Sequence, residues 1–415
     1  MSAVVLQGDA RDLPLPDASV DLIVTSPPYF GLRSYTDGGE HYAGQIGSEA
    51  TPQEWVANLL ACTREWIRVL KPSGSLFVNL GDKYAGGGQW DKDERPDPGR
   101  RRAVSGKIGT GGNCYGLKPK SLLGLPWRYA LACIDQLGLI LRAEIVWSKP
   151  NGLPESVTDR VRRSHEQVFH FTRLPRYYSA VDEIREATTA YRGAQPVALR
   201  DRTTTLKVPG NTPMSGTQLE PNPLGKLPGS VWDIPSQPLT VPPALGVDHF
   251  AAFPMELPRR IILGWSPPGV CTACGEGRRP VADKQFRKKQ ESYWDRKAKR
   301  DSDEPDGNDR GFNSVGYPCG RYEVTISAYS CGCGIWPLDA VQPSTRPAVV
   351  LDPFGGTGTT ALVATMHGRT GITVDRSADY CRLAAWRTSD PAERARALQV
   401  PKPPPVYDGQ GELFG

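Results

Sequence analysis

The sequence predicts an α/β fold with a mostly parallel sheet, and three observations support this. Short runs of Val, Ile and Leu, such as residues 21–25 and 348–352, end in polar residues and turns, as buried strands do. Longer segments with apolar residues at helical spacing, such as 53–70, stand between such runs. The two patterns alternate along the chain, which is typical of strand–helix–strand units with parallel strands.

The expected elements can be placed in chain order. Each expected strand is short and apolar, and each expected helix carries an apolar stripe. The expected strands cover residues 3–7, 21–25, 75–80, 141–147, 167–172, 348–352 and 370–375. The expected helices cover residues 52–70, 125–137, 359–367 and 379–386, and the segment 249–263 begins as a loop and continues as a helix.

Segments without periodicity separate these ordered parts. The chain has 415 residues with 44 Gly and 39 Pro, so its loops must be long. The irregular segments are a polar loop at 84–120, a Pro-rich region at 185–247, an insertion at 271–340 with cysteines and a charged centre, and a Pro-rich tail at 399–415. The core is therefore expected to be assembled from residues 1–83, 121–184, 248–270 and 341–398.

Composition narrows the class of protein. The net charge of +5 and the pI of about 8.6 are compatible with a nucleic-acid partner but do not demand one. The N-terminus has no signal-peptide pattern, and no run of about 18 apolar residues occurs, so we expect a soluble, cytoplasmic protein without a membrane partner. Four of the nine cysteines are clustered, which favours a metal site in a reducing compartment over a disulfide scaffold.

A glycine-rich turn follows one predicted strand and opens a helix. In Asp352-Pro-Phe-Gly-Gly-Thr-Gly-Thr-Thr360, the glycines let the backbone approach a ligand, and the helix N-terminus offers free N–H groups. A strand about twenty residues later ends in Asp375, which is placed to accept hydrogen bonds from ribose hydroxyls. A tight turn without a ligand stays open as an alternative. A Walker phosphate loop is excluded because no Gly-Lys-Ser/Thr follows.

A rigid tip ends the predicted strand 21–25. In Thr25-Ser-Pro-Pro-Tyr29, two prolines fix the backbone between a hydroxyl and an aromatic ring. A proline turn that only closes the strand is the alternative when this stretch is taken alone.

The two motifs together resemble those of S-adenosylmethionine-dependent DNA amino-methyltransferases. The glycine turn is similar to their Asp-Pro-Phe-x-Gly-x-Gly-Thr-Thr cofactor motif, and the tip is similar to their catalytic motif. Here the catalytic motif comes first, which resembles the circularly permuted β class. Segments 79–84, 116–127, 147–160 and 164–166, and the Phe-Pro-Met-Glu-Leu-Pro segment from Phe253, also resemble the family. The resemblance implies a Rossmann-like sheet of the methyltransferase type, and it breaks down at 84–115, 185–245 and 271–340.

The resemblance also implies site residues. The catalytic candidates are Ser26, Pro27, Pro28 and Tyr29. The candidates for binding S-adenosylmethionine are Asp9, Asp352, Pro353, Phe354, Gly356, Gly358, Thr359 and Asp375. Residues 1–83 then form the catalytic half of the core, and residues 341–398 form the cofactor-binding half.

The groups of the Ser-Pro-Pro-Tyr tip match what methyl transfer to an exocyclic amine requires. An exocyclic amine on a base is a poor nucleophile, since its lone pair is delocalised into the ring. Ser26 Oγ and the Pro27 carbonyl can accept its N–H bonds from fixed positions, and Tyr29 offers a face for a base extruded from duplex DNA.

The identity of residue 26, the serine of the catalytic motif, indicates which base is methylated. Ser at this position in the family mostly accompanies cytosine N4, and Asp mostly accompanies adenine N6, so we favour cytosine N4 and keep adenine N6 as the alternative. More distant alternatives are an RNA or protein methyltransferase and a catalytically silent DNA-binding protein.

Two pairs of cysteines in the insertion have metal-ligand spacing. Cys271-x₂-Cys274 and Cys331-x-Cys333 would supply four thiolates to a structural, tetrahedral Zn²⁺ in a ribbon-like module. Cys319 is a competing ligand, and buried free cysteines are the alternative.

Contacts to DNA are expected outside the core motifs. Residues 185–247 are the expected target-recognition region, with 84–120 as a second contributor. The basic segment 284–300 could bind phosphate, or it could be a solvated helix beside the acidic run 301–306. The individual candidates for facing DNA are Lys118, Lys120, Arg160, Arg163, His165, Lys288 and Lys289.

The tail ends in a short peptide with a candidate partner. Gln410-Gly-Glu-Leu-Phe414 resembles the peptides that dock on the bacterial sliding clamp, through Gln410, Leu413 and Phe414. An apolar tail that packs on its own domain is the alternative. No nuclease motif occurs, so any restriction endonuclease would be a separate chain in the bacterial or phage-infected cell.

Overall fold

The computed structural model divides the chain into two units. The first comprises Met1–Ala180, Gly229–Val270 and Thr345–Gly415, and the second comprises Val181–Pro228 and Cys271–Ser344. The residues that the structure describes are 3–31, 36–37, 40–41, 44–86, 115–152, 154–186, 225–247, 253–288, 320–341 and 343–402.

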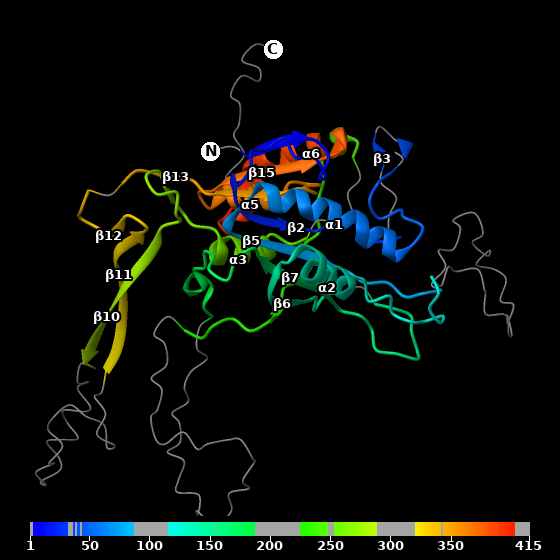
Figure 1. Cartoon of the computed structure of the whole chain (residues 1–415), viewed down its shortest axis with the longest axis horizontal. Helices are drawn as coiled ribbons and strands as arrows, with labels where there is room; N and C mark the ends of the chain where they lie inside the picture. Colours follow the sequence, from blue (N-terminus) through cyan, green and yellow to red (C-terminus); the bar gives the residue numbers. More distant parts are fainter. Residues whose placement is uncertain are drawn as a thin grey trace, which may run out of the picture. The chain divides into compact units, whose positions relative to one another are not determined.

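Within the described residues, the first unit is built on an eight-stranded sheet in the order β1-β15-β14-β2-β5-β7-β6-β8 (Figure 1). The strands from β1 to β5 in this order are parallel, β7 is antiparallel to both β5 and β6, and β8 is parallel to β6. The mostly parallel α/β fold is therefore confirmed. The strands are β1 (Val4–Gln7), β2 (Val20–Thr25), β5 (Leu70–Leu80), β6 (Ile140–Ser148), β7 (His165–Thr172), β8 (Val231–Asp233), β14 (Val349–Asp352) and β15 (Thr370–Asp375).

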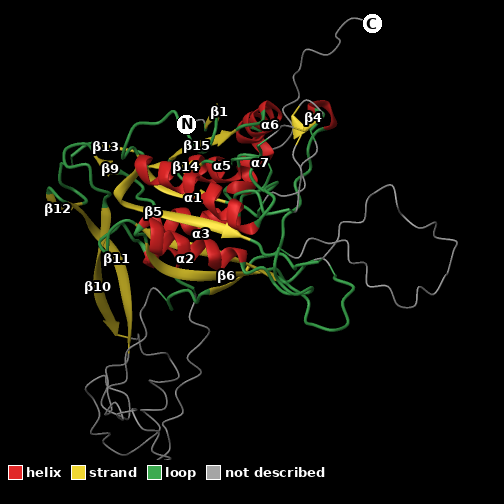
Figure 2. Cartoon of the chain, turned by 45° about the vertical axis from the view of Figure 1, so that its right-hand side comes forward, coloured by secondary structure: helices red, strands yellow, loops and turns green. Residues whose placement is uncertain are grey.

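Helices cover both faces of this sheet (Figure 2). Their boundaries follow local signals: Thr51 caps the first turn of α1 by accepting the Glu54 N–H, and Gly138 ends α2 in the left-handed region. The helices are α1 (Pro52–Val69), α2 (Leu125–Leu137), α3 (Glu256–Trp265), α5 (Thr359–Met366), α6 (Ala378–Ser389) and α7 (Pro391–Ala397), with a single-turn 3-10 helix η3 (Pro243–Leu245). Another single-turn 3-10 helix, η2 (Val181–Ile184), belongs to the second unit.

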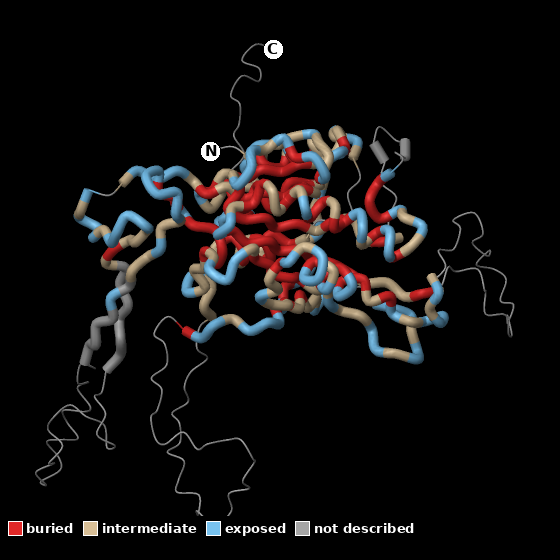
Figure 3. Tube along the Cα trace, in the orientation of Figure 1, coloured by how far each residue is buried: buried red, intermediate tan, exposed pale blue. Residues whose placement is uncertain are grey.

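Side-chain alternation along the strands divides the core into two layers. Leu76 and Val78 of β5 belong to the cluster that includes buried side chains of α1 and α2. Phe77, between them, contacts Trp265 of α3 with ring centroids 4.9 Å apart, and it stacks on His170 of β7. Buried residues accordingly run through the centre of this unit in Figure 3. Burial lowers the pKa of His170 to about 3, so this ring is neutral in the core.

The second unit contains a three-stranded antiparallel sheet in the order β10-β11-β12. Its strands are β10 (Arg279–Lys288), β11 (Gly320–Cys331) and β12 (Gly334–Pro337). Residues 284–288 therefore lie in a strand, and the alternative of a helix is wrong for them. Outside these two sheets, β9 (Val270–Cys271) pairs with β13 (Thr345–Arg346), and in the first unit β3 (Thr36–Asp37) pairs with β4 (Glu40–His41).

Several elements differ from expectation. Residues 229–247, which we assigned to the target-recognition region, belong to the first unit, where β8 extends the main sheet. Strand β5 begins at Leu70 rather than at residue 75, because Leu70 already pairs with Val20. Helix α7 was not expected and is capped by Asp390, which accepts the Ala392 and Glu393 N–H groups. No helix among the described ranges has both the length and the apolar character needed to cross a bilayer.

Candidate active site

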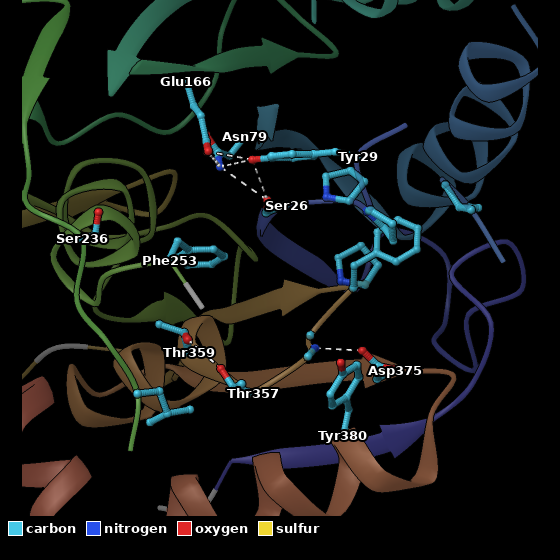
Figure 4. Close-up of a pocket in the computed structure, with 18 of the residues that line it drawn as sticks. Ser26, Tyr29, Asn79, Glu166, Ser236, Phe253, Thr357, Thr359, Asp375 and Tyr380 are labelled. Carbon is cyan, nitrogen blue, oxygen red and sulfur yellow. Dashed lines mark hydrogen bonds between the residues drawn. The ribbon is translucent and has the colours of Figure 1, made fainter. Parts of the chain in front are cut away.

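The two sequence motifs meet at one edge of the sheet. Strands β14 and β2 are parallel neighbours, with Leu351 opposite Ile23, so the glycine turn after Asp352 and the tip after Thr25 leave the sheet side by side. In open α/β sheets, ligands bind outside the carboxyl ends of parallel strands. A cavity of about 1030 Å³ lies there, and both motifs line it (Figure 4).

Residues of α1 and of the segment that follows β5 hold the Ser-Pro-Pro-Tyr tip in place. Trp55 of α1 donates its indole N–H to the Pro28 carbonyl at 3.1 Å. The Tyr29 ring lies against Gly81, which directly follows β5. The Ser26 hydroxyl reaches the Tyr29 hydroxyl at 3.3 Å. The four residues of the tip all line the cavity, so the structure brings the catalytic candidates together.

Three side chains that the sequence analysis did not assign to a role complete this wall. Tyr29 Oη donates to Glu166 Oε2 at 2.7 Å, and Asn79 Nδ2 lies 2.8 Å from both of these oxygens. Lys149 pairs with the other Glu166 oxygen. Figure 4 shows Ser26, Tyr29, Asn79 and Glu166 converging. The sequence offered one indication of their importance: all three residues lie in segments 79–84, 147–160 and 164–166, which resemble the methyltransferase family.

The opposite wall is the glycine turn and the end of β15. A Cβ on Gly355 would stand 1.5 Å from Thr373 Oγ1, and Gly358 has φ +72° where α5 begins, so neither position accepts a side chain without strain. The Gly356 N–H donates to Asp375 Oδ2 at 2.8 Å, and the Ser377 N–H donates to Asp375 Oδ1 at 2.9 Å. These bonds fix the Asp375 carboxylate at the cavity.

Two of the cofactor candidates do not line the cavity among the described residues. Asp352 is 1% exposed and accepts hydrogen bonds from Thr360 Oγ1 at 2.9 Å and from the Phe354 N–H at 3.1 Å. Burial raises the pKa of Asp352 to about 6. Asp352 and Gly358 therefore shape the turn from inside, whereas Asp9, Pro353, Phe354, Gly356, Thr359 and Asp375 face the cavity.

Asp9 lies on this wall as part of an ion pair. Arg11 forms a two-point contact with its carboxylate, with Nε–Oδ1 at 3.0 Å and Nη2–Oδ2 at 2.6 Å. The hydrogen bond from Arg11 holds the pKa of Asp9 below its ordinary value against the opposing effect of burial.

The candidates for DNA contact are scattered, and three of the seven, Lys120, Arg160 and Arg163, interact with other side chains. Lys118 is exposed, and Lys120 pairs with Asp159 at 2.5 Å on the surface. Arg160 pairs with Glu155 at 2.8 Å and lies over the ring of Tyr84.

Of the remaining DNA candidates, Arg163 lines the cavity and His165 is exposed at the start of β7. Arg163 Nη1 is buried without a hydrogen bond among the described residues and stands 3.9 Å from Asp82. Lys288 ends β10, and Lys289 lies outside the described residues.

The four predicted metal ligands form a cluster in the second unit. The sulfurs of Cys271, Cys274, Cys331 and Cys333 all lie within 4.8 Å of one another, and the Cys271 and Cys333 sulfurs are 3.9 Å apart. Cys274 and Cys333 are exposed, which does not fit the alternative of buried free cysteines. Cys319 lies outside the described residues.

A Rossmann-like sheet with a nucleotide-type glycine turn beside a Ser-Pro-Pro-Tyr tip defines an S-adenosylmethionine-dependent amino-methyltransferase. The chain belongs to the N6/N4 DNA methylase family, whose model, described as DNA methylase, matches residues 20–272 and 338–385. The match omits residues 273–337, which contain most of the predicted insertion. The protein is therefore a DNA methyltransferase, and its methyl donor is S-adenosylmethionine.

Similarity to known proteins supports the assignment to this family. The chain is 35% identical over 270 residues to the type II methyltransferase M.SmaI of Serratia marcescens, covering 65% of this chain and 77% of the relative. It is 36% identical over 270 residues to the type II methyltransferase M.Cfr9I of Citrobacter freundii, covering 64% and 74%. The solved structure of PvuII DNA methyltransferase (cytosine-N4-specific) aligns with a TM-score of 0.50 and 16% identity, covering 96% of this chain and 93% of that one, and it shares the fold.

The residues of the cavity fit this cofactor. Phe354, Asp375 and Tyr380 line the cavity. The two rings would offer aromatic surface to an adenine ring, and the carboxylate at the strand end would offer acceptors to ribose hydroxyls, as in other such sheets. When bound there, the cofactor supplies an activated methyl group.

We expect Gly81→Ala to lower methyl transfer strongly. Its Cβ would stand 2.6 and 2.9 Å from two carbons of the Tyr29 ring, so the ring must move away from its present position. Misplacement by about 1 Å costs up to about 10²-fold in rate, which single-turnover labelling of DNA would measure. Gly229→Ala is the matched control, since a Cβ there meets nothing within 4 Å. A Gly81→Ala protein with the parental rate would show that the position of Tyr29 does not matter.

Proposed function

We propose that this protein methylates the exocyclic N4 amine of cytosine at a specific site in duplex DNA, with the target base turned out of the helix. The observation that carries the proposal is the neutral hydroxyl of Ser26 at the tip, where the family's adenine enzymes mostly have Asp. Adenine N6 is the second candidate, because the same tip chemistry serves either amine.

In this function the protein acts mainly by positioning the target amine and the methyl donor, since the methyl group of the donor is already activated. Ser26 Oγ and the Pro27 carbonyl accept the two N–H bonds of the target amine, which favours a tetrahedral nitrogen as the bond to methyl forms. Trp55 holds the tip through the Pro28 carbonyl, so these acceptors keep their geometry. The glycine turn and Asp375 hold the methyl donor on the opposite wall of the cavity.

The test is transfer of tritium from labelled S-adenosylmethionine into mixed-sequence duplex DNA, followed by mass analysis of the nucleosides. N4-methylcytosine is the expected product. N6-methyladenine would overturn the base assignment and leave the family and the fold intact.

Asp375→Ala should weaken binding of S-adenosylmethionine. Loss of hydrogen bonds to ribose costs about 1.5–3 kcal/mol when the acceptor is charged, which is about 10- to 10²-fold in dissociation constant. Isothermal titration calorimetry measures this directly. Asp135→Ala, an exposed carboxylate on α2, is the control. An unchanged dissociation constant in Asp375→Ala would remove Asp375 from the cofactor site.

We also propose that Cys271, Cys274, Cys331 and Cys333 bind one structural Zn²⁺. Four sulfurs at about 2.3 Å from a tetrahedral Zn²⁺ stand about 3.8 Å apart, close to the 3.9 Å between Cys271 and Cys333. The pairs flank β10 and β11, so the ion would close the base of that sheet. A closed site with four thiolates and no open position has a structural role rather than a catalytic one.

The purified protein is expected to contain about one Zn²⁺ per chain by elemental analysis. Cys274→Ser should lose most of the metal, and Cys381→Ser, which changes a cysteine of the first unit, should retain it. Chelation should open the second unit to proteolysis. Metal-free protein whose second unit resists protease would refute the site.

The other expected partners stay predictions. The relatives are named type II methyltransferases, which supports pairing with a separate restriction endonuclease. Residues 187–224, most of the expected target-recognition region, and the clamp-binding candidates Gln410, Leu413 and Phe414 lie outside the described residues. The 84–120 loop is described only at 84–86 and 115–120.

A further inference from the structure

We propose that Glu166 is the terminal acceptor of a proton relay that begins at Ser26 and passes through Tyr29. The inference rests on the proposed function, because it concerns the proton that an amine must lose once it is methylated. It assigns a role to a carboxylate that lies outside both the catalytic motif and the cofactor motif.

The relay is a continuous chain of hydrogen bonds with one direction. Ser26 Oγ donates to Tyr29 Oη at 3.3 Å, and Tyr29 Oη donates to Glu166 Oε2 at 2.7 Å. Asn79 Nδ2 donates to Tyr29 Oη at 2.8 Å and occupies one of its two lone pairs. The Tyr29 proton is therefore directed to Glu166, and the remaining lone pair faces Ser26.

The carboxylate is kept in place by its surroundings. Lys149 pairs with Oε1, while Oε2 also accepts from Asn79 Nδ2 at 2.8 Å. The side chains of Lys149 and Glu166 are 23% and 17% exposed, so the pair is largely shielded from water yet keeps a path to it. The Lys149 ammonium also lies 4.2 Å from the centre of the Trp147 ring, which restricts its movement.

Strand topology explains why a carboxylate from β7 reaches this edge. The tip and Asn79 lie at the carboxyl ends of β2 and β5, whereas Glu166 lies near the start of β7. Because β7 runs antiparallel to β5, its beginning lies at the same edge as their ends, with Gln167 opposite Leu80. The first residues of β7 are therefore placed to act on the tip.

The proton count balances. As the bond between the amine nitrogen and the methyl carbon forms, the bond between that carbon and the sulfonium sulfur breaks, and its electron pair stays on sulfur. The methylated nitrogen then carries a positive charge and two protons, and it becomes neutral by losing one of them. That proton passes to Ser26 Oγ, the Ser26 proton passes to Tyr29 Oη, and the Tyr29 proton passes to Glu166 Oε2. No oxidant or further reactant is required.

Single-turnover tritium transfer to DNA that the parental protein labels tests the relay. Glu166→Gln keeps the size of the side chain and an oxygen that accepts from Tyr29, but the amide cannot take the proton. Tyr29→Phe keeps the ring and removes the middle of the chain. Each variant should lower the rate about 10²-fold. The double variant should be no slower than either, since both interrupt one pathway.

Binding measurements and a rescue experiment separate proton transfer from structural support. The dissociation constants of both variants for S-adenosylmethionine and DNA should match the parental values. Formate should restore part of the rate to Glu166→Ala, where it can occupy the vacated space, and should not restore Glu166→Gln. Glu65→Gln is the matched control, because Glu65 is 14% exposed and paired with Arg68 away from the cavity.

The outcomes are distinct. A parental rate in Glu166→Gln or in Tyr29→Phe would overturn the relay, and so would additive losses in the double variant. Identification of the labelled nucleoside from the same reactions tests the base assignment separately: N6-methyladenine with a slow Glu166→Gln would refute cytosine N4 while supporting the relay.

Discussion

Replacing Ser26 by alanine should lower the single-turnover rate of methyl transfer about 10²- to 10³-fold, the usual cost of removing one preorganised hydrogen-bonding group from a reacting centre. The substitution removes the acceptor proposed for the target amine and also the first member of the chain that leads through Tyr29 to Glu166. It creates no large cavity, because only one oxygen is lost.

The measurement should compare rate with binding. Ser26→Ala should bind S-adenosylmethionine and DNA as the parental protein does, since the glycine turn and Asp375 lie on the other wall of the cavity (Figure 4). Ser48→Ala is the control, because its hydroxyl bonds to the Gln45 carbonyl and it does not line the cavity. Retained activity in Ser26→Ala would refute the role of the tip hydroxyl.

Glu393→Ala should destabilise the protein by about 3–5 kcal/mol, because it leaves the guanidinium of Arg387 buried without its counter-charge. The two side chains are 7% and 3% exposed and meet at 2.9 Å. Arg387 Nη1 also donates to Thr357 Oγ1 at 2.6 Å and to Thr359 Oγ1 at 2.7 Å. The pair therefore ties α6 and α7 to the glycine turn, and its loss should weaken cofactor binding as well as folding.

Denaturant unfolding with and without S-adenosylmethionine measures both effects. Arg382→Ala provides the contrast, since it breaks an ion pair with Asp379 in which Arg382 is 60% exposed, and exposed pairs contribute at most about 1 kcal/mol. A Glu393→Ala protein as stable as Arg382→Ala would show that Arg387 finds another way to satisfy its charge.

The elements of the main sheet were predictable where a strong local pattern coincided with burial. Helix α2 has the expected bounds, and the strand that ends at Asp375 has them too. Strand β8 was missed because Val231–Asp233 is only three residues long in a Pro-rich region, and its pairing with β6 stabilises it. Strand β10 was missed because its many charges mask the strand pattern, and its register comes from β11.

The sequence by itself determined the family, both motifs and the metal-ligand spacing of the cysteines, because each depends on residues close together along the chain. Only the tertiary structure brought Asn79, Lys149 and Glu166 to the Ser26–Tyr29 tip and joined Arg387 to the glycine turn. It also showed that Asp352 supports the turn from inside and does not face the cavity. These contacts join residues far apart in sequence, and they form because parallel and antiparallel strands end and begin at the same edge of one sheet.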